Sequence, residues 1–252
     1  MDINSIRHHK EKTYVTISMI AGAFIWLILF LITGGIGLIL LGLIFAFFAW
    51  LTGMYFEAEI YGESVNVSEN QYPEIHKIVS QQSEKLGITP PNIFIYNGNG
   101  MINAIATQYL SKRHIILMSD LVDLMLERKK IEELSMIIGH ELGHHFAGHT
   151  NTWKNLLIKP SKFIPFLGSA YSRSCELTAD RIGYLLTDNL KTAQNALVTI
   201  ALGSKSLADF TNIDVFIQQE RKIPELMGFI HKIYASHPRM TKRIIEITEY
   251  KK

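Results

Sequence analysis

Apolar residues are concentrated in one long run near the N-terminus of this 252-residue chain. From Tyr14 to Tyr55 there is no Lys, Arg, Asp or Glu, and most residues are Leu, Ile, Phe, Ala or Gly. The run is too long for one spanning helix, which needs about 20 residues, but long enough for two. Thr33-Gly34-Gly35 lies near its middle, where a glycine pair favours a turn. The pattern predicts a transmembrane helical hairpin over 14–55, with helices at 14–33 and 36–55.

The charges that flank this hairpin predict its orientation. Three basic residues precede the first span, whereas Glu57, Glu59 and Glu63 follow the second with no Lys or Arg among them. The positive-inside rule therefore places the N-terminal segment 1–13 in the cytoplasm, and two crossings return 56–252 to the same side. A secretory signal peptide would have a shorter apolar core. A re-entrant hairpin that does not cross the bilayer is the competing interpretation.

The remaining residues, 56–252, are enough for one globular domain with its own core. A helix is predicted from Tyr72 to Leu86, with Pro73 in its first turn and Gly87 just past its end. Short alternating segments then predict strands, and from Leu121 onward the pattern is nearly all helical. The predicted strands cover 92–96, 103–107 and 114–118. The expected fold class is α+β and helix-rich, with a small antiparallel sheet.

Composition excludes some classes of protein. The single cysteine, Cys175, rules out an intrachain disulfide and agrees with a reducing compartment. A formal net charge of +2 gives no reason to expect nucleic-acid binding.

The segment His140-Glu141-Leu142-Gly143-His144 carries the most informative chemistry. Histidines four apart on a helix lie one turn apart on one face, so both imidazoles can reach one zinc ion. The glutamate between them can take a proton from a water beside that ion. Since His140 and His144 lie nearly opposite the apolar stripe of a helix over 130–149, they are not core histidines of that stripe. The motif predicts zinc-dependent hydrolysis, with peptide bonds as the leading substrate.

Two further features of this helix bear on its packing. His145 and His149 are also four apart, but they project onto the apolar side, where packing or a buried hydrogen bond is the expected role. Glycines at 139, 143 and 148 each cost about 1 kcal/mol relative to alanine within a helix. Their density indicates that another segment packs close to this backbone, with fraying or a bend as the alternative.

A catalytic zinc usually has three protein ligands, so one more is required. The extended pattern H-E-x-x-H-x-x-G-x-x-H fails here, because Ala147 and Thr150 occupy its glycine and histidine positions. A later helix offers Glu176 and Asp180, whose carboxylates share a face. Glu176 can bind zinc while Asp180 accepts a hydrogen bond from a ligand histidine. A solvated carboxylate face is the alternative interpretation.

With these residues in view, the chain resembles the integral-membrane zinc metalloendopeptidases that include the heat-shock protease HtpX and the CAAX prenyl protease. Four segments in the same order carry the resemblance: His140 to His144, Glu176 to Asp180, Asn103-Ala104-Ile105-Ala106, and Ser236-His237-Pro238 with Arg243. The resemblance implies a zincin-like domain of the glutamate-ligand class. It also implies one Zn²⁺ per chain on His140, His144 and Glu176, with Glu141 as general base and Asp180 beside a ligand.

The same resemblance implies roles for two more segments. Asn103, Ala104, Ile105 and Ala106 correspond to an edge strand that pairs with substrate backbone. His237 and Arg243 correspond to a pair near the oxyanion and the substrate, although His237 alone is also compatible with a helix-start residue.

The chain departs from the family in one respect. Many members carry two more spanning helices between the zinc helix and the third-ligand helix, but residues 151–172 contain lysines and prolines and cannot span a bilayer. This difference argues against an enclosed intramembrane chamber and a prenylated substrate. It favours a domain that rests on the membrane surface.

The sequence therefore predicts an integral membrane zinc endopeptidase with a cytoplasmic catalytic domain. Its expected partners are a polypeptide substrate, drawn from membrane or membrane-associated proteins as in HtpX-like quality control, and the lipid bilayer. A dedicated processing protease, a zinc enzyme acting on a lipid and a non-proteolytic zinc-stabilised scaffold remain as alternatives. The sequence does not predict an oligomeric state.

Overall fold

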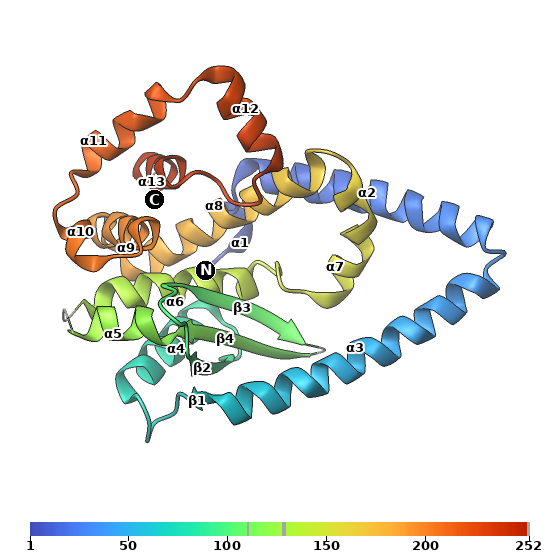
Figure 1. The fold of residues 1–252 in the computed structure, drawn as a ribbon, viewed down its shortest axis with the longest axis horizontal. Helices are drawn as coiled ribbons and strands as arrows, with labels where there is room; N and C mark the ends of the chain where they lie inside the picture. Colours follow the sequence, from blue (N-terminus) through green and yellow to red (C-terminus); the bar gives the residue numbers. More distant parts are fainter. Residues whose placement is uncertain (110, 128–129, 251–252) are drawn as a thin grey trace.

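A computed structural model describes residues 1–109, 111–127 and 130–250 of the chain. Two long helices, α2 (His9–Ile32) and α3 (Ile36–Glu63), extend from a body built of a small sheet and shorter helices (Figure 1). A short helix, α1 (Ile3–Ile6), precedes them. Residues 251–252, the last two of the predicted domain, lie outside the described residues.

The two long helices meet at the predicted turn. Gly34 and Gly35 have φ values of +62° and +77°, a backbone conformation that glycine adopts without steric cost. Helix α2 begins earlier than predicted, at His9, and α3 continues beyond Tyr55 to Glu63. From the turn the two helices diverge towards the body (Figure 1). By length and composition both can cross a membrane, with mean hydropathies of 2.6 and 2.3 in their most apolar windows.

Within the described residues the sheet has four strands, in the order β1-β2-β4-β3. The pairings β1–β2 and β3–β4 are antiparallel, but β2–β4 is parallel, so the sheet is mixed rather than antiparallel as expected. The reason is topological. After β2 the chain forms the outer strand β3, which runs opposite to β2, and it then returns in β4, which lies between them and runs parallel to β2. The strands are β1 (Ser64–Asn66), β2 (Asn92–Tyr96), β3 (Ala104–Tyr109) and β4 (Lys112–Met118).

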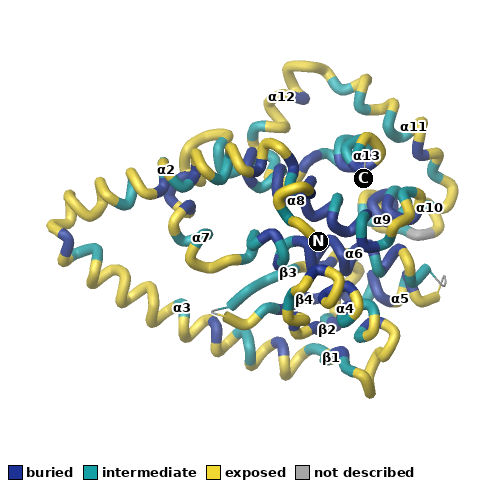
Figure 2. The backbone as a smooth tube through the Cα atoms, turned by 180° about the vertical axis from the view of Figure 1, so that it is seen from behind, coloured by how far each residue is buried: buried dark blue, intermediate teal, exposed yellow. Residues whose placement is uncertain are grey.

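Helices pack around this sheet and form one main core. Buried apolar side chains from the sheet, α4, α5, α6, α8, α9 and α13 make up this core, whereas α2 and α3 are largely exposed (Figure 2). The helices of the body are α4 (Pro73–Leu86), α5 (Ser119–Glu127), α6 (Ile131–Phe146), α7 (Thr152–Ile158), α8 (Leu167–Thr187), α9 (Leu190–Leu202), α10 (Lys205–Asp209), α11 (Ile213–Gln218), α12 (Glu225–Tyr234) and α13 (Met240–Glu249), with 3₁₀ turns η1 (Lys159–Phe163) and η2 (Gln219–Lys222). The helix-rich α+β class is therefore confirmed.

Glycines bring helices α6 and α8 into close contact. A Cβ added at Gly139 would lie 3.1 Å from Gly183 Cα, and one added at Gly143 would lie 3.2 Å from Ala179 Cα. The predicted close approach to this backbone is thus confirmed for both glycines. It fixes the distance between the helix that carries the two histidines and the helix that carries Glu176.

Gly183→Ala is expected to destabilise the protein by about 1–3 kcal/mol, the usual cost of overpacking. Its Cβ would lie 2.8 Å from the carbonyl oxygen of Met136 and 3.1 Å from the amide nitrogen of His140, and backbone atoms cannot move aside cheaply. Denaturant unfolding of the detergent-solubilised protein measures the effect. Gly62→Ala is the matched control, because a Cβ there meets no atom of the described residues within 4 Å. Equal stability of the Gly183 variant and the wild type would contradict this prediction.

Candidate metal centre

Three metal-binding side chains converge where α6 faces α8. His140 Nε2 lies 3.2 Å from His144 Nε2 and 3.6 Å from Glu176 Oε2, and His144 Nε2 lies 3.5 Å from Glu176 Oε1. The helical spacing of four places both imidazoles on one face of α6. The glycine contacts between the helices then bring the Glu176 carboxylate opposite them.

These spacings suit a zinc ion. Two donors about 2.0–2.1 Å from a tetrahedral zinc lie roughly 3.3 Å apart, close to the separations of 3.2–3.6 Å in this group. Two imidazoles and one carboxylate are also a common donor set of catalytic zinc, which keeps one position open. Burial raises the pKa of the Glu176 carboxyl, but the adjacent imidazoles of His140, His237 and His144 outweigh burial and hold that pKa well below its usual value. The donors present therefore fit zinc.

Asp180 and Arg243 support His140 from behind. His140 Nδ1 lies 2.9 Å from Asp180 Oδ1, and since a carboxylate only accepts, Nδ1 donates and Nε2 faces the other two donors. Arg243 donates to the same carboxylate from Nε at 2.7 Å and from Nη2 at 2.6 Å. Burial raises the pKa of Asp180, but the adjacent guanidinium outweighs burial and holds that pKa below its ordinary value. Asp180 is thus an ionised, fully buried acceptor.

The side chain of Glu141, on α6, points towards the edge strand β3 of the sheet. This side chain is buried, with the residue 7% exposed, and accepts a hydrogen bond from the backbone N–H of Ala106 on β3. Burial raises the pKa of the Glu141 carboxyl above its usual value. A carboxylate with a raised pKa is a stronger base than a solvated one, which is what proton abstraction near neutral pH requires.

A cavity of about 680 Å³ connects these groups. It is lined by the three converging donors, by Glu141, by residues 103–106 of the β3 region, and by His237 and Arg243. Every site residue predicted from the sequence except Asp180 therefore lines this one cavity. Asp180 instead contacts the Nδ1 atom of His140.

His237 and Arg243 differ in how they face this cavity. His237, between α12 and α13, has a side chain that is 66% exposed and an Nδ1 that lies 3.2 Å from Glu176 Oε2. The hydrogen bond to Glu176 raises the pKa of His237. Arg243 is 7% exposed and commits two donor nitrogens to Asp180. Two of its donor nitrogens therefore hold Asp180, and Arg243 also lines the cavity, so its role near the oxyanion stays a prediction.

The predicted substrate-binding segment lies at the sheet edge. Strand β3 is the outer strand beside β4, and Asn103 O accepts from Met118 N at 3.0 Å. Because hydrogen-bonded pairs alternate in an antiparallel ladder, the backbone groups of Ala104 and Ala106 point away from β4. The Ala104 N–H is capped by Asn103 Oδ1 at 2.9 Å, and Ala106 N–H meets Glu141. Ile105, between them, is 42% exposed.

His145 and His149, the second histidine pair, lie in different environments. His145 is buried, with Nδ1 3.0 Å from Thr150 Oγ1 and Nε2 3.1 Å from His114 O, so the predicted buried hydrogen-bonding role is confirmed for it. His149 does not share that helical face, because α6 ends at Phe146.

Beyond this helix end the chain turns back towards the metal centre. Gly148 has a φ of +70°, a conformation that favours glycine, and it directs His149 to within 3.0 Å of His144, between their Nδ1 atoms. Sequence reasoning missed this contact. The available signal was Gly148 itself, since a glycine in this conformation commonly ends a helix.

Comparison with known proteins places this arrangement in a class. The model of peptidase family M48 matches residues 69–159 and 151–251, so the chain belongs to peptidase family M48. The family resemblance stated from the sequence is thereby confirmed.

Two sequence relatives and one solved structure are similar to the chain. The chain is 28% identical over 211 residues to the plastoglobule-localized metallopeptidase 48, chloroplastic, of Arabidopsis thaliana, covering 75% of this chain and 60% of the relative. It is 32% identical over 98 residues to a Protease HtpX homolog of Thermodesulfovibrio yellowstonii, covering 39% and 33%. The crystal structure of S. mikatae Ste24p aligns with a TM-score of 0.49 at 16% identity, covering 94% of this chain and 67% of that one. The chain thus spans less than two thirds of the length of both sequence relatives.

Proposed function

We propose that this chain is a membrane-anchored zinc endopeptidase that holds one zinc ion on His140, His144 and Glu176. The observation that carries the proposal is the spacing of these three donors, which fits tetrahedral zinc, beside the buried carboxylate of Glu141. Membership of peptidase family M48 supports the same activity.

In this proposal zinc, when bound, supplies a Lewis acid for a carbonyl oxygen and lowers the pKa of water. Glu141 removes a proton from the attacking water and passes it to the leaving amine, which is general acid–base catalysis by one carboxyl. His237 projects into the cavity beside Glu176, where its imidazole donates to the negative charge that develops on the carbonyl oxygen. Asp180 and Arg243 act on the reaction by orienting His140.

The proposed substrate is an extended polypeptide that pairs with the edge of β3. Ala104 and Ala106 turn their backbone groups away from β4 and line the cavity. Their N–H groups meet Asn103 Oδ1 and Glu141, so an added strand gains main-chain hydrogen bonds by donating to their carbonyl oxygens. A lipid has no backbone to pair with, so this edge favours peptide bonds over lipid esters. Membrane or membrane-associated proteins are the proposed substrates because of the two long helices, and turnover of damaged proteins is the proposed role.

The membrane setting rests on the exposed apolar surface of α2 and α3. Only 11% and 6% of their most apolar windows are buried within the protein, and such a surface in water would be strongly unfavourable. We propose that 14–55 crosses the bilayer, with 1–13 and the peptidase domain 56–252 on the cytoplasmic side. Trp153 and Phe163, which are 79% and 89% exposed, lie on segments that pack along α2 and suit a membrane interface.

Removal of the metal tests the proposed activity. We expect the purified protein in detergent micelles to cleave casein, to lose this cleavage when zinc is removed with 1,10-phenanthroline, and to regain it when Zn²⁺ is restored. The measurement is the appearance of casein fragments together with the zinc content of the protein. A protein that binds zinc but cuts neither casein nor itself would instead be a zinc-stabilised scaffold. Full cleavage without metal would contradict the proposal.

A further inference from the structure

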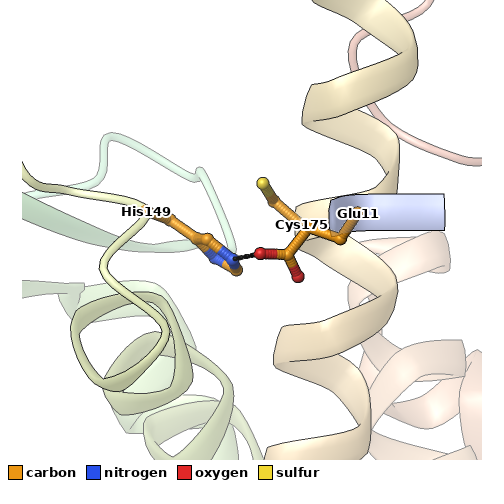
Figure 3. A group of neighbouring side chains, drawn as sticks. All are labelled: Glu11, His149 and Cys175. Atoms are coloured by element: carbon orange, nitrogen blue, oxygen red, sulfur yellow. Dashed lines mark hydrogen bonds and ion pairs between the residues drawn. The ribbon is translucent and has the colours of Figure 1, made fainter. Parts of the chain in front are cut away.

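A second group of buried polar side chains lies directly behind the metal centre. Glu11 comes from the first turn of α2, His149 from the loop after α6, and Cys175 from α8, one residue before Glu176 (Figure 3). Their ligand atoms lie within 4.8 Å of one another. Glu11 is the only acidic residue in the sequence between Asp2 and Glu57, so it is the one carboxylate that residues 3–56 can contribute.

Hydrogen bonds connect this group to His144. His149 Nε2 lies 3.1 Å from Glu11 Oε1, which Figure 3 shows as a dashed line, and His149 Nδ1 lies 3.0 Å from His144 Nδ1. The carboxylate only accepts, so His149 Nε2 carries a hydrogen and, in the neutral ring, Nδ1 accepts. His144 Nδ1 must then donate, which leaves the lone pair of His144 Nε2 facing His140 and Glu176.

We propose that Glu11 and His149 are positioning residues for the metal centre: Glu11 orients His149, and His149 fixes the tautomer and ring orientation of His144. The inference rests on the proposed zinc site. It gives His144 the same kind of support that Asp180 gives His140, because a ligand histidine is more basic and better oriented when its second nitrogen donates a hydrogen bond.

The surroundings of Glu11 favour this positioning role over a second metal ion. Glu11 is 0% exposed, and its carboxylate is paired with Arg7 and accepts from Thr178 Oγ1 as well as from His149. The ammonium of Lys154 also contributes charge near Glu11 and Cys175. Two cations close to the group oppose a divalent ion, and the hydrogen bonds already engage both oxygens of the carboxylate.

The contacts around Glu11 also couple the start of the first long helix to the metal centre. Arg7 Nη2 donates to Ala147 O at 2.7 Å, at the end of α6. The backbone N–H of His8 donates to Thr178 Oγ1 at 3.0 Å, on α8. The segment before the first span therefore binds both helices that carry the metal donors, and Glu11 extends that contact to His144 through a single imidazole.

Zinc affinity of the full-length protein, measured by competition with a chromogenic chelator, tests the inference. His149→Leu removes both hydrogen bonds and is expected to weaken zinc binding about 10–100-fold, the usual effect of losing such a partner. His149→Asn keeps an acceptor near the position of Nδ1 and should restore part of the affinity. Glu11→Gln keeps the shape but removes the charge, and should weaken binding in the same direction by a smaller factor. Cobalt-substituted protein should show an altered visible spectrum in His149→Leu.

His145→Leu is the matched control, because His145 is also a buried histidine with two hydrogen bonds, but these go to Thr150 and His114 rather than to any of the three metal donors. Zinc affinity that falls equally in His145→Leu and His149→Leu would overturn the inference, as would wild-type affinity and spectrum in His149→Asn and Glu11→Gln together. Binding of two zinc ions per chain, with one lost in Cys175→Ser, would also overturn it. A wild-type protein that binds no zinc would instead refute the proposed function on which the inference rests.

Discussion

Glu141→Gln is expected to abolish peptide-bond cleavage while leaving zinc bound. Glutamine has nearly the same shape, so its side-chain oxygen can still accept from Ala106 N–H, but it cannot take a proton from water. Loss of a general base typically lowers the rate by about 10²–10⁴-fold. The measurement is kcat/KM on casein alongside the zinc content of the same preparation.

Glu132→Gln is the control for this prediction. Glu132 lies on the same helix but is exposed and contributes nothing to the cavity that holds the metal donors. We expect wild-type cleavage and zinc content from it. Cleavage at the wild-type rate by Glu141→Gln would show that another group acts as the base. In membranes, the inactive variant should also retain uncut substrates, which would identify what the protease acts on.

Arg243→Met is expected to lower the free energy of unfolding by about 3–5 kcal/mol, because it leaves the carboxylate of Asp180 buried without its charged partner. Asp180 is 0% exposed, and Arg243 supplies two of its hydrogen bonds, at 2.7 and 2.6 Å. Asp180 also orients His140, so zinc affinity should fall together with stability. Denaturant unfolding of the zinc-free protein isolates the stability effect from the metal effect.

Lys242→Met controls for the loss of a cation from the same helix. Lys242 Nζ pairs with Glu246 at 3.2 Å, but its side chain is 44% exposed, and such surface pairs contribute about 0–1 kcal/mol. If both variants lost the same stability, the buried pair would have no special role and the explanation for Arg243 would fail.

Features that depend on local sequence were predicted well. The turn at residues 33–35 follows from two adjacent glycines, and strand β2 was predicted with the bounds that the structure has, Asn92–Tyr96. The convergence of His140 and His144 follows from helical spacing alone. For Glu176 and Asp180 a solvated carboxylate face was the alternative interpretation until the family resemblance favoured a role at the metal, and the structure brings both beside His140.

Features that depend on contacts between distant segments were missed. The parallel pairing of β2 with β4 arises because β3 lies at the outer edge of the sheet. The order of strands in a sheet cannot be predicted from the residue pattern of any one strand. The role of Glu11 was missed because its sequence neighbours show only a charged residue beside an apolar run. Its partners Thr178 and His149 are far away in the sequence. His149 was placed on the wrong face because the helix was extended through Gly148, where the backbone reverses instead.

The central claim is that zinc binds to His140, His144 and Glu176. X-ray absorption at the zinc edge of the purified wild-type protein tests it most directly, because the second group of possible ligands contains a cysteine sulfur and the first does not. Zinc on His140, His144 and Glu176 predicts only nitrogen and oxygen neighbours at about 2.0–2.2 Å. Zinc held with Glu11, His149 and Cys175 would add a sulfur neighbour at about 2.3 Å. We expect one zinc per chain and no sulfur in its coordination shell. A sulfur neighbour, or no bound zinc at all, would contradict the account.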